Sequence, residues 1–568
     1  MKAKIAKVVQ SVFRVVNPLR WLRRGWFALG NLRRRRRKIE YVALTLPSSL
    51  PPLPEARPWW QRRVMGDSPL SLLELDRFFE QVGRDPRPKG VILVLRGLNM
   101  PLADLETLRG SLLRLRQTGK RVICFAQDYD NATYFIASAA DEIVLQPGGS
   151  LNTVGLLAQA VFLKDALNTL GVEAEAIAIS PYKTALDRLA NSDLSPESRE
   201  QLNSLLDSQF DILTGGIAAG RKVSPEAVRT MIDNAPHLDS DALAAGYVDS
   251  VENEEALYRR LASEHVLTLK QARKTLLRQW RKPAQRYVAL LRVGGLIVSG
   301  ESGSPPVDIP IPIIGGERMG DLTVVRQVRN LMQDQGAAAV ILFVDSGGGS
   351  ASASEAMASA LDELAQNRPL VVYMNSVAAS GGYYIATPAH WIVAQPGTIT
   401  GSIGVISGKI ITDGLWERLH VNRVQLARGA NADLFGDSGP MTDNQRAKLR
   451  AGIEHTYQQF GGRVAASRKM PFEAVDAVGG GRVWTGQQAI RHGLVDELGG
   501  VDAALNKARE LANLPDDAPL AIFQGKGRPL LPQLAEKADP TAGLRYLHEN
   551  LRGIFNGSAQ LLLPFWWE

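Results

Sequence analysis

The chain of 568 residues contains an internal repeat, and this repeat limits the folds open to it. Residues 91–155 match residues 340–404 under a constant shift of 249 positions, without a gap. The shift pairs Val91-Ile92-Leu93 with Val340-Ile341-Leu342, and Tyr134 with Tyr383. A chain this long exceeds what one hydrophobic core organises. We therefore predict two units of similar fold.

The order of segments within each copy indicates the fold class. An apolar strand is followed by an amphipathic helix, a second strand, a Gly-rich turn, a helix and a third strand, which is typical of a parallel sheet covered by helices. The stretches 340–344 and 370–374 are short, continuous β-branched and aromatic runs, as buried parallel strands are. The sequence predicts an α/β protein with two tandem units.

Matches outside the best-conserved core extend each copy. Tyr41-Val42-Ala43-Leu44 recurs at Tyr287, and the stretch that ends at Asp249 recurs at Asp496. These matches give the expected boundaries. The predicted segments are a basic amphipathic segment at 1–39, a first repeat at 40–260, a helical linker at 261–285, a second repeat at 286–525 and a tail with an apolar end at 526–568.

Positive charge is concentrated at the N-terminus. The whole chain has a net charge of +8, but the first 38 residues hold thirteen basic side chains and no acidic one, so the rest is net negative. Apolar and aromatic residues at helical spacing lie among these charges, which favours an anionic membrane surface as the partner over nucleic acid. The longest uncharged run, Gly25–Leu32, is far shorter than the roughly 18 apolar residues of a membrane span. We expect a peripheral anchor and leave the membrane face open.

Cysteine and histidine give no indication of a metal or a disulfide. Cys124 is the one cysteine and lies in an apolar run, where thiols are usually inert. The seven histidines show no metal-binding spacing such as H-E-x-x-H. We expect no metal ion and no other cofactor.

The two copies differ where polar and glycine residues could carry chemistry. Asn131 stands in the first copy where the second has Ser380, and Met100 stands where the second has Gly349. Ser380 follows a strand and precedes a predicted helical turn, whose first N–H groups favour negative charge. The N–H groups of Gly349 and Gly381 could together hold an oxyanion. The second copy is the one equipped for nucleophilic catalysis.

A serine nucleophile needs a base, and the residues alone do not identify it. No histidine has a telling spacing, whereas a lysine can act as the base if burial lowers its pKa. Spacing does not single out one lysine among the many in the chain.

Three motifs of the second copy resemble a known family. They are Ala378-Ala379-Ser380-Gly381-Gly382-Tyr383-Tyr384, Ser346-Gly347-Gly348-Gly349-Ser350 and Thr400-Gly401-Ser402-Ile403-Gly404-Val405. Together they resemble the long, tandem-repeat form of signal peptide peptidase A, a serine–lysine protease family of the Clp protease/crotonase superfamily. The resemblance covers both repeats and implies a crotonase-like fold for each.

The resemblance also implies a role for each site residue. The family nucleophile maps to Ser380, and its lysine base maps to Lys183 in Tyr182-Lys183-Thr184-Ala185 of the first repeat. The serine that orients this lysine maps to Ser402. The implied activity is an endopeptidase that degrades released signal peptides and similar apolar peptides at a bacterial-type inner membrane, as a homo-oligomer, with a tetramer favoured.

Two departures from the family and two alternative functions remain. The usual S-P-G-G turn is Ser346-Gly347-Gly348-Gly349, and the membrane span of long family members is replaced by Arg33–Arg37. One alternative is acyl-CoA chemistry on the same fold, in which oxyanion turns polarise a thioester. The other is a non-catalytic membrane-associated scaffold. The first repeat is a precedent for it, because that repeat lacks the serine and the glycine of the second.

Overall fold

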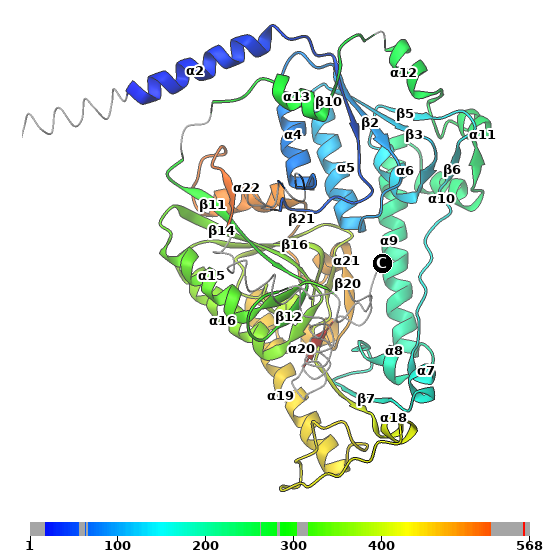
Figure 1. Cartoon of the computed structure of the whole chain (residues 1–568), viewed down its shortest axis with the longest axis vertical. Helices are drawn as coiled ribbons and strands as arrows, with labels where there is room; N and C mark the ends of the chain where they lie inside the picture. The colour runs from blue at the N-terminus through cyan, green and yellow to red at the C-terminus, as the bar shows by residue number, and fades with distance from the viewer. Residues whose placement is uncertain are drawn as a thin grey trace, which may run out of the picture. The chain divides into compact units, whose positions relative to one another are not determined.

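The computed structural model describes residues 18–55, 63, 66, 68–261, 263–280, 284–303, 316–523 and 560–562 (Figure 1). The chain forms two compact units. Unit 1 comprises Met1–Met100, Thr107–Gly155 and Leu213–Pro283, and unit 2 comprises Pro101–Glu106, Leu156–Ile212 and Ala284–Glu568. These units do not follow the sequence repeats, because residues 156–212 belong to the first repeat but pack in unit 2.

A six-stranded parallel sheet forms the centre of unit 1. Its strand order is β10-β1-β2-β3-β5-β9, and all five neighbouring pairs are parallel. Its strands β2 and β3 are almost wholly buried, as their apolar sequences predict. The strands of this sheet are β1 (Tyr41–Thr45), β2 (Gly90–Leu95), β3 (Arg121–Ala126), β5 (Glu142–Leu145), β9 (Ser250–Val251) and β10 (Val266–Thr268).

Helices and a small second sheet complete unit 1. The small sheet pairs β4 (Tyr129–Asp130), β6 (Ser150–Asn152) and β8 (His237–Leu238). The helices are α2 (Pro18–Arg35), α4 (Leu72–Arg84), α6 (Asn131–Ala137), α10 (Pro225–Asp233), α11 (Asp239–Ala244), α12 (Glu254–Arg260) and α13 (Leu269–Thr275). Two further helices, α5 (Leu102–Gln117) and α9 (Pro196–Arg221), have residues in both units.

The largest sheet of unit 2 is built around two long buried strands, β14 (Ala337–Ser346) and β16 (Leu370–Ala379). Its path is β20-β18-β16-β14-β11-β22, with β17 and β21 attached beside β16. The other strands are β11 (Tyr287–Gly294), β17 (Trp391–Ala394), β18 (Ile399–Gly401), β20 (Val483–Thr485), β21 (Glu497–Leu498) and β22 (Leu520–Ile522).

Strand β16 changes partner along its length. Val371–Met374 pair with β17, whereas Val377–Ala379 pair with β18. The change leaves Asn375 and Ser376 at the fork, and the strand ends directly before Ser380. The fork therefore brings the residue after β16 beside the residues that follow β18.

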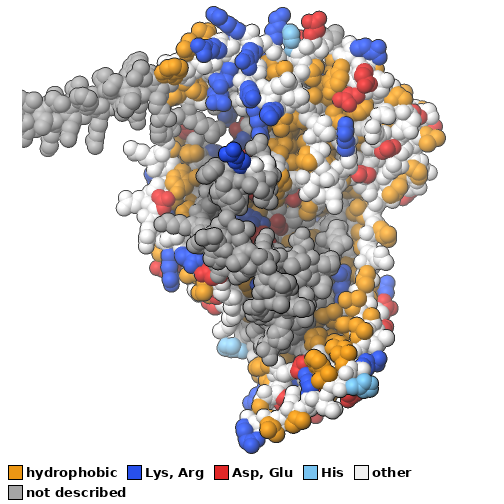
Figure 2. All heavy atoms as spheres, viewed as in Figure 1, with side chains coloured by type: hydrophobic (Ala, Val, Ile, Leu, Met, Phe, Trp, Pro, Cys, Tyr) orange, Lys and Arg blue, Asp and Glu red, His pale blue; other side chains and the backbone are white. Residues whose placement is uncertain are grey.

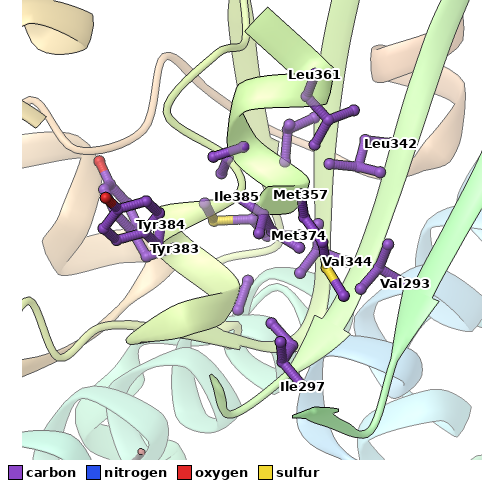
Figure 3. Close-up of a cluster of buried hydrophobic side chains, with 14 of the residues drawn as sticks. Val293, Ile297, Leu342, Val344, Met357, Leu361, Met374, Tyr383, Tyr384 and Ile385 are labelled. Atoms are coloured by element: carbon purple, nitrogen blue, oxygen red, sulfur yellow. The ribbon is translucent and has the colours of Figure 1, made fainter. Parts of the chain in front are cut away.

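The hydrophobic core of unit 2 fixes the position of this fork. Side chains of β14 and β16, such as Leu342, Val344 and Met374, pack with Met357 and Leu361 of α16 (Ala351–Asn367) (Figure 3). The remaining helices of unit 2 are α7 (Lys164–Thr169), α8 (Asp187–Ala190), α15 (Asp321–Gln333), α17 (Gly381–Tyr384), α18 (Asp413–Arg418), α19 (Asp443–Arg468), α20 (Phe472–Val478), α21 (Gly486–Arg491) and α22 (Val501–Leu511).

A second sheet of unit 2 has the order β13-β12-β15-β23-β19-β7. Strand β7 comes from the first sequence repeat and pairs antiparallel with β19 through six residues. The C-terminal strand β23 lies between β15 and β19. The strands are β7 (Glu173–Ala178), β12 (Leu296–Val298), β13 (Arg318–Gly320), β15 (Gly348–Ser350), β19 (Ile406–Ile411) and β23 (Gln560–Leu562).

The sequence repeat recurs in matching contacts within each unit. The Tyr134 hydroxyl donates to the carbonyl of Tyr247 at 2.7 Å, and the Tyr383 hydroxyl donates to the carbonyl of Leu494 at 2.8 Å. Likewise Arg221 pairs with Asp249, and Arg468 pairs with Asp496. The repeated sequence positions thus make the same contacts in the two units.

The observed elements confirm the predicted α/β class with parallel sheets and helices, and they refine several segments. Among the described residues of 261–285, the stretch interpreted as a helical linker, only Leu269–Thr275 are helical, and β10 adds a strand to unit 1. In the part of the chain that the structure describes, no helix has the length and apolarity that a bilayer span requires. Residues 1–17 lie outside the described residues, as does the tail 526–568 apart from 560–562.

Candidate active site

Ser380 lies at a sharp turn between β16 and α17. Its backbone has a φ of +55°, which is unusual for a residue other than glycine and is found where surrounding structure enforces it. The Ser380 N–H donates to the carbonyl of Gly401 at 2.8 Å, which ties the turn to the end of β18. The side chain is fully buried among the residues described. The turn therefore aims one hydroxyl into the interior of unit 2.

Lys183 reaches the same place from the first sequence repeat. The pairing of β7 with β19 continues where the Ile179 N–H donates to the carbonyl of Val405 at 3.0 Å. The chain then turns, with the Lys183 N–H donating to the carbonyl of Ser180 at 3.2 Å. Only 1% of the Lys183 surface is exposed. Strand pairing thus places a lysine in the interior, although it is 197 residues from Ser380 in the sequence.

The structure brings three of the predicted site residues together. The Nζ atom of Lys183 lies 2.8 Å from Ser380 Oγ, 2.9 Å from Ser402 Oγ and 3.0 Å from the Ser402 carbonyl oxygen. Ser402 also has a positive φ, +50°, and its N–H donates to the carbonyl of Arg482 at 2.6 Å. Two fixed turns therefore present two hydroxyls to one amine.

Burial determines the protonation of this lysine. Desolvation lowers the pKa of Lys183 well below its ordinary value, because the ammonium loses its hydration in the interior. Its hydrogen-bond partners are serine oxygens, which carry no negative charge to offset that loss. The amine is thereby favoured in its neutral form, which can accept a proton.

The two glycine turns lie against each other beside Ser380. A Cβ atom on Gly381 would lie 3.2 Å from the backbone nitrogen of Gly349. Gly349 has a φ of +153°, and a Cβ there would lie 2.0 Å from the carbonyl oxygen of Ile297, so only glycine fits. As the first residue of α17, Gly381 has an N–H without a partner within the helix. The two residues predicted to hold an oxyanion are neighbours in space.

The hydroxyl of Ser346 stabilises the turn that lacks the family proline. It donates to the carbonyl of Gly295 at 2.6 Å and accepts from the Gly348 N–H at 3.1 Å. These two bonds fix the backbone just before Gly349. A side chain therefore supplies part of the restraint that proline would give.

Several residues near the site have no signal in the sequence. Gln201 on α9 is buried and bonds to the backbone on both sides of the site, at Tyr182 and at Val483. Gly481 packs so closely that a Cβ on it would lie 2.7 Å from Lys183 Cα. These contacts use backbone atoms of the neighbouring chain, and such contacts leave no motif to detect.

Two carboxyl groups, those of the buried Asp104 and the partly buried Asp345, lie beneath the fork in β16. Asp345, at the end of β14, accepts from the Val377 N–H at 3.2 Å and from Asn375 Nδ2 at 3.3 Å. Burial and the charge of Asp345 raise the pKa of Asp104 to about 7. Burial likewise raises the pKa of Asp345. The fork therefore carries an acid pair that resists full ionisation.

The corresponding place in unit 1 has different chemistry. Asn131, which matches Ser380, donates from Nδ2 to the carbonyl of Gly155 at 2.6 Å. Thr153, which matches Ser402, is buried, and its Oγ1 has no hydrogen-bond partner among the described residues. The amide of Asn131 thus closes the turn itself and presents no nucleophile.

Comparison with known proteins places these motifs in a family. The model of Peptidase family S49 matches the chain twice, at residues 114–268 and 362–515. The chain is 30% identical to "Serine protease SPPA, chloroplastic" of Arabidopsis thaliana, over 79% of this chain and 67% of that protein. It is also 30% identical to "Protease 4" of Salmonella typhi, over 78% and 72% of the two chains. A "Protease 4" of Haemophilus influenzae is 29% identical, over 78% and 73%.

Proposed function

The chain belongs to peptidase family S49 and is a serine protease, and on that premise we propose that Ser380 and Lys183 form its catalytic dyad. The observation that carries the proposal is the distance of 2.8 Å between Lys183 Nζ and Ser380 Oγ in a buried site. A base within this distance of a hydroxyl can take its proton as the hydroxyl attacks. The substrates are released signal peptides and similar apolar peptides.

Acylation begins with proton transfer from Ser380 to Lys183. Neutral Nζ accepts the hydroxyl proton while Oγ forms a bond to the carbonyl carbon of the peptide. The carbonyl oxygen becomes an oxyanion, and the N–H groups of Gly349 and Gly381 stabilise it. Lys183 then gives its proton to the amide nitrogen, the C–N bond breaks, and an acyl-enzyme remains on Ser380.

Deacylation repeats these steps with water as the nucleophile. Lys183 accepts a proton from water as the water oxygen attacks the acyl carbon, and it returns a proton to Ser380 Oγ as the ester bond breaks. Ser402 keeps Nζ in place through both halves, because its hydroxyl and its carbonyl both lie within 3.0 Å of that atom. A lysine side chain has four rotatable bonds, and these contacts restrict it.

Replacing Ser380 with alanine tests the nucleophile. Ser380→Ala should lower the hydrolysis of apolar peptides by about 10⁴-fold or more, because removal of the nucleophilic oxygen abolishes the acyl-enzyme. The matched control is Asn131→Ala at the same position of the first repeat, and it should retain activity. Hydrolysis by Ser380→Ala near the parent rate would show that another residue is the nucleophile. Covalent labelling of Ser380 by a serine-directed acylating agent also separates this chemistry from acyl-CoA chemistry.

The N-terminal helix supports a peripheral location on an anionic membrane. One face of α2 is held within unit 1, where Asn31 Nδ2 donates to the carbonyl of Arg278 at 2.8 Å and the Phe27 ring meets the Trp280 ring edge-on. The side chains of Trp26, Leu29 and Leu32 are exposed, with Trp26 73% exposed. An apolar face beside Arg33–Arg37 suits a bilayer interface with anionic headgroups.

Exposed apolar side chains on unit 2 support assembly into a homo-oligomer, and the resemblance to the family favours a tetramer. Figure 2 shows hydrophobic side chains gathered in the lower part of the displayed face. Leu157, Val424 and Leu426 are 93%, 86% and 90% exposed. Soluble monomers rarely expose large contiguous apolar patches. Light scattering in mild detergent should give a mass above that of one chain, and Leu157→Ser with Leu426→Ser should reduce it; a monomeric parent would disprove the assembly.

A further inference from the structure

Gln201 joins the two parts of the chain that meet at the candidate dyad. Its Nε2 donates to the carbonyl of Tyr182 at 2.9 Å, and its Oε1 accepts from the Val483 N–H at 3.0 Å. A donor on one side and an acceptor on the other allow only one orientation of the amide. The side chain is buried, so water does not replace either bond at low cost.

Each end of this bridge leads directly to a site residue. Tyr182 precedes Lys183 in the chain. Val483 pairs with Gly401 in the antiparallel β20–β18 ladder, and the carbonyl of Gly401 accepts from the Ser380 N–H. The backbone carbonyl of Arg482, next to Val483, accepts a hydrogen bond from the N–H of Ser402. One side chain therefore connects the segment that carries the lysine with the strands that hold both serines.

We propose that Gln201 is a positioning residue that keeps the Lys183 amine in contact with Ser380 and Ser402. The inference depends on the proposed dyad and adds a residue that does not touch the reacting atoms. Without the bridge, the Tyr182–Lys183 backbone can move away from β20, and water can reach Nζ. A better hydrated amine holds its proton more tightly, so the pKa of Lys183 should rise toward its ordinary value.

The test uses two glutamines that link the same elements. Gln201→Met keeps the size of the side chain and removes both hydrogen bonds. The matched control is Gln488→Met, because Gln488 on α21 donates to Ser204 Oγ of α9 at 3.0 Å and bonds to the backbone of Thr485, without touching the Lys183 segment. Both variants lose bonds between α9 and the region of β20, and only one loses the bond beside the lysine.

The expected results separate positioning from general stability. Gln201→Met should lower kcat by about 10- to 100-fold, as small misplacements of catalytic groups do, and should move the rising limb of the pH–rate profile to higher pH. Gln201→Glu should move it further, because a carboxylate favours the ammonium. Gln488→Met should leave the profile in place. An unmoved profile for Gln201→Met, or an equal movement for Gln488→Met, disproves the proposal.

A readout without peptide hydrolysis keeps this inference distinct from the proposed function. The pH dependence of Lys183 acetylation by acetic anhydride, followed by mass spectrometry in the Ser380→Ala background, reports when the amine becomes neutral. Its midpoint should be higher in the variant that also carries Gln201→Met. If the midpoint is unchanged, Gln201 does not position the amine, whatever the activity assay gives.

Discussion

At the scale of single residues, the site depends on keeping one amine neutral. Lys183 is almost fully buried, and desolvation lowers its pKa because its hydrogen-bond partners are uncharged serine oxygens. Lys409, a second buried lysine of unit 2, donates instead to the carbonyls of Asp433 and Ser438. Its partners are backbone carbonyls, and it contacts neither Ser380 nor Ser402. The difference makes Lys409 a control for every substitution of Lys183.

The pH dependence of hydrolysis should follow Lys183. Activity should rise with pH as the ammonium loses its proton, and because the pKa is lowered, the plateau should be reached well below the ordinary lysine pKa. Lys183→Ala should be nearly inactive, and Lys183→Arg should not restore activity, since a guanidinium stays protonated. Lys409→Ala should keep the parent profile. Initial rates between pH 5 and pH 10 check this, and a flat or falling profile contradicts a lysine base.

Asp104 should make the free energy of unfolding depend on pH. Its folded-state pKa of about 7 lies above the unfolded value of 3.8, so the folded state binds more protons between these values. The contribution of Asp104 to stability should therefore be most favourable below about pH 4, decline as the pH rises toward 7 and stay level above it. Asp104→Asn should remove this decline and add about 4 kcal/mol at most at pH 8. Urea unfolding at pH 5 and pH 8 measures both, and an equal effect at the two pH values excludes this cause.

Some residues of the candidate site can be predicted from the sequence, and others cannot. The contrast between the two repeats is enough to single out Ser380, Gly349 and Gly381. Lys183 follows only from the resemblance to the family, because its contact with Ser380 spans 197 positions and arises from the β7–β19 pairing. Gln201 and Gly481 are not predictable, since they act on backbone atoms. Contacts of that kind depend on the fold and not on any local pattern.

At the scale of elements, strand pairing determines features of the secondary structure that the local sequence does not predict. The apolar run that predicts a strand at 370–374 stops at Met374, yet β16 continues to Ala379 because it changes partner from β17 to β18. Strand β7 contains Glu173-Ala174-Glu175-Ala176, a composition that favours helix. Its pairing with β19 overrides that preference. Both features, the extension of β16 and the strand β7, occur next to the segments that carry Ser380 and Lys183.

The turn before β20 should be intolerant of any side chain. Gly481 has a φ of +93°, and a Cβ there would lie 2.7 Å from Lys183 Cα. Gly481→Ala should displace Lys183 and lower kcat by about 100-fold. The control is Gly429→Ala, where φ is +101° and nothing lies within 4 Å of a Cβ, so only backbone strain of about 1 kcal/mol results. Equal loss of activity in the two variants would falsify the steric explanation.

At the scale of the whole molecule, the duplication divides labour between the two copies. Residues 156–212 of the first repeat pack in unit 2 and contribute the lysine, while the second repeat contributes both serines. The region of the second repeat that matches Lys183, Arg428–Ala432, contains no lysine. In unit 1, Asn131 stands at the position that matches Ser380. The chain therefore carries one complete set of proposed site residues. The absence of a serine at position 131 of unit 1 does not affect this set.

Attachment of the whole molecule to a membrane should depend on α2 and on charge. The thirteen basic residues of the first 38 attract anionic lipid, and the exposed face of Trp26, Leu29 and Leu32 can enter only the headgroup region. Replacing these three side chains with serine should release the chain from vesicles that contain phosphatidylserine, with peptide hydrolysis retained. The control carries Leu238→Ser and Leu243→Ser, two exposed leucines of unit 1 outside α2.

Salt distinguishes peripheral attachment from an integral anchor. Raising the salt concentration should weaken vesicle binding of the parent, because counterions screen the attraction between arginine and phosphate. Neutral vesicles should bind it poorly at any salt concentration, since the apolar face alone is small. Sedimentation with vesicles measures the bound fraction in each case. A parent chain that stays with the membrane through high salt and alkaline carbonate would require an integral anchor, and the interfacial role of α2 would then be wrong.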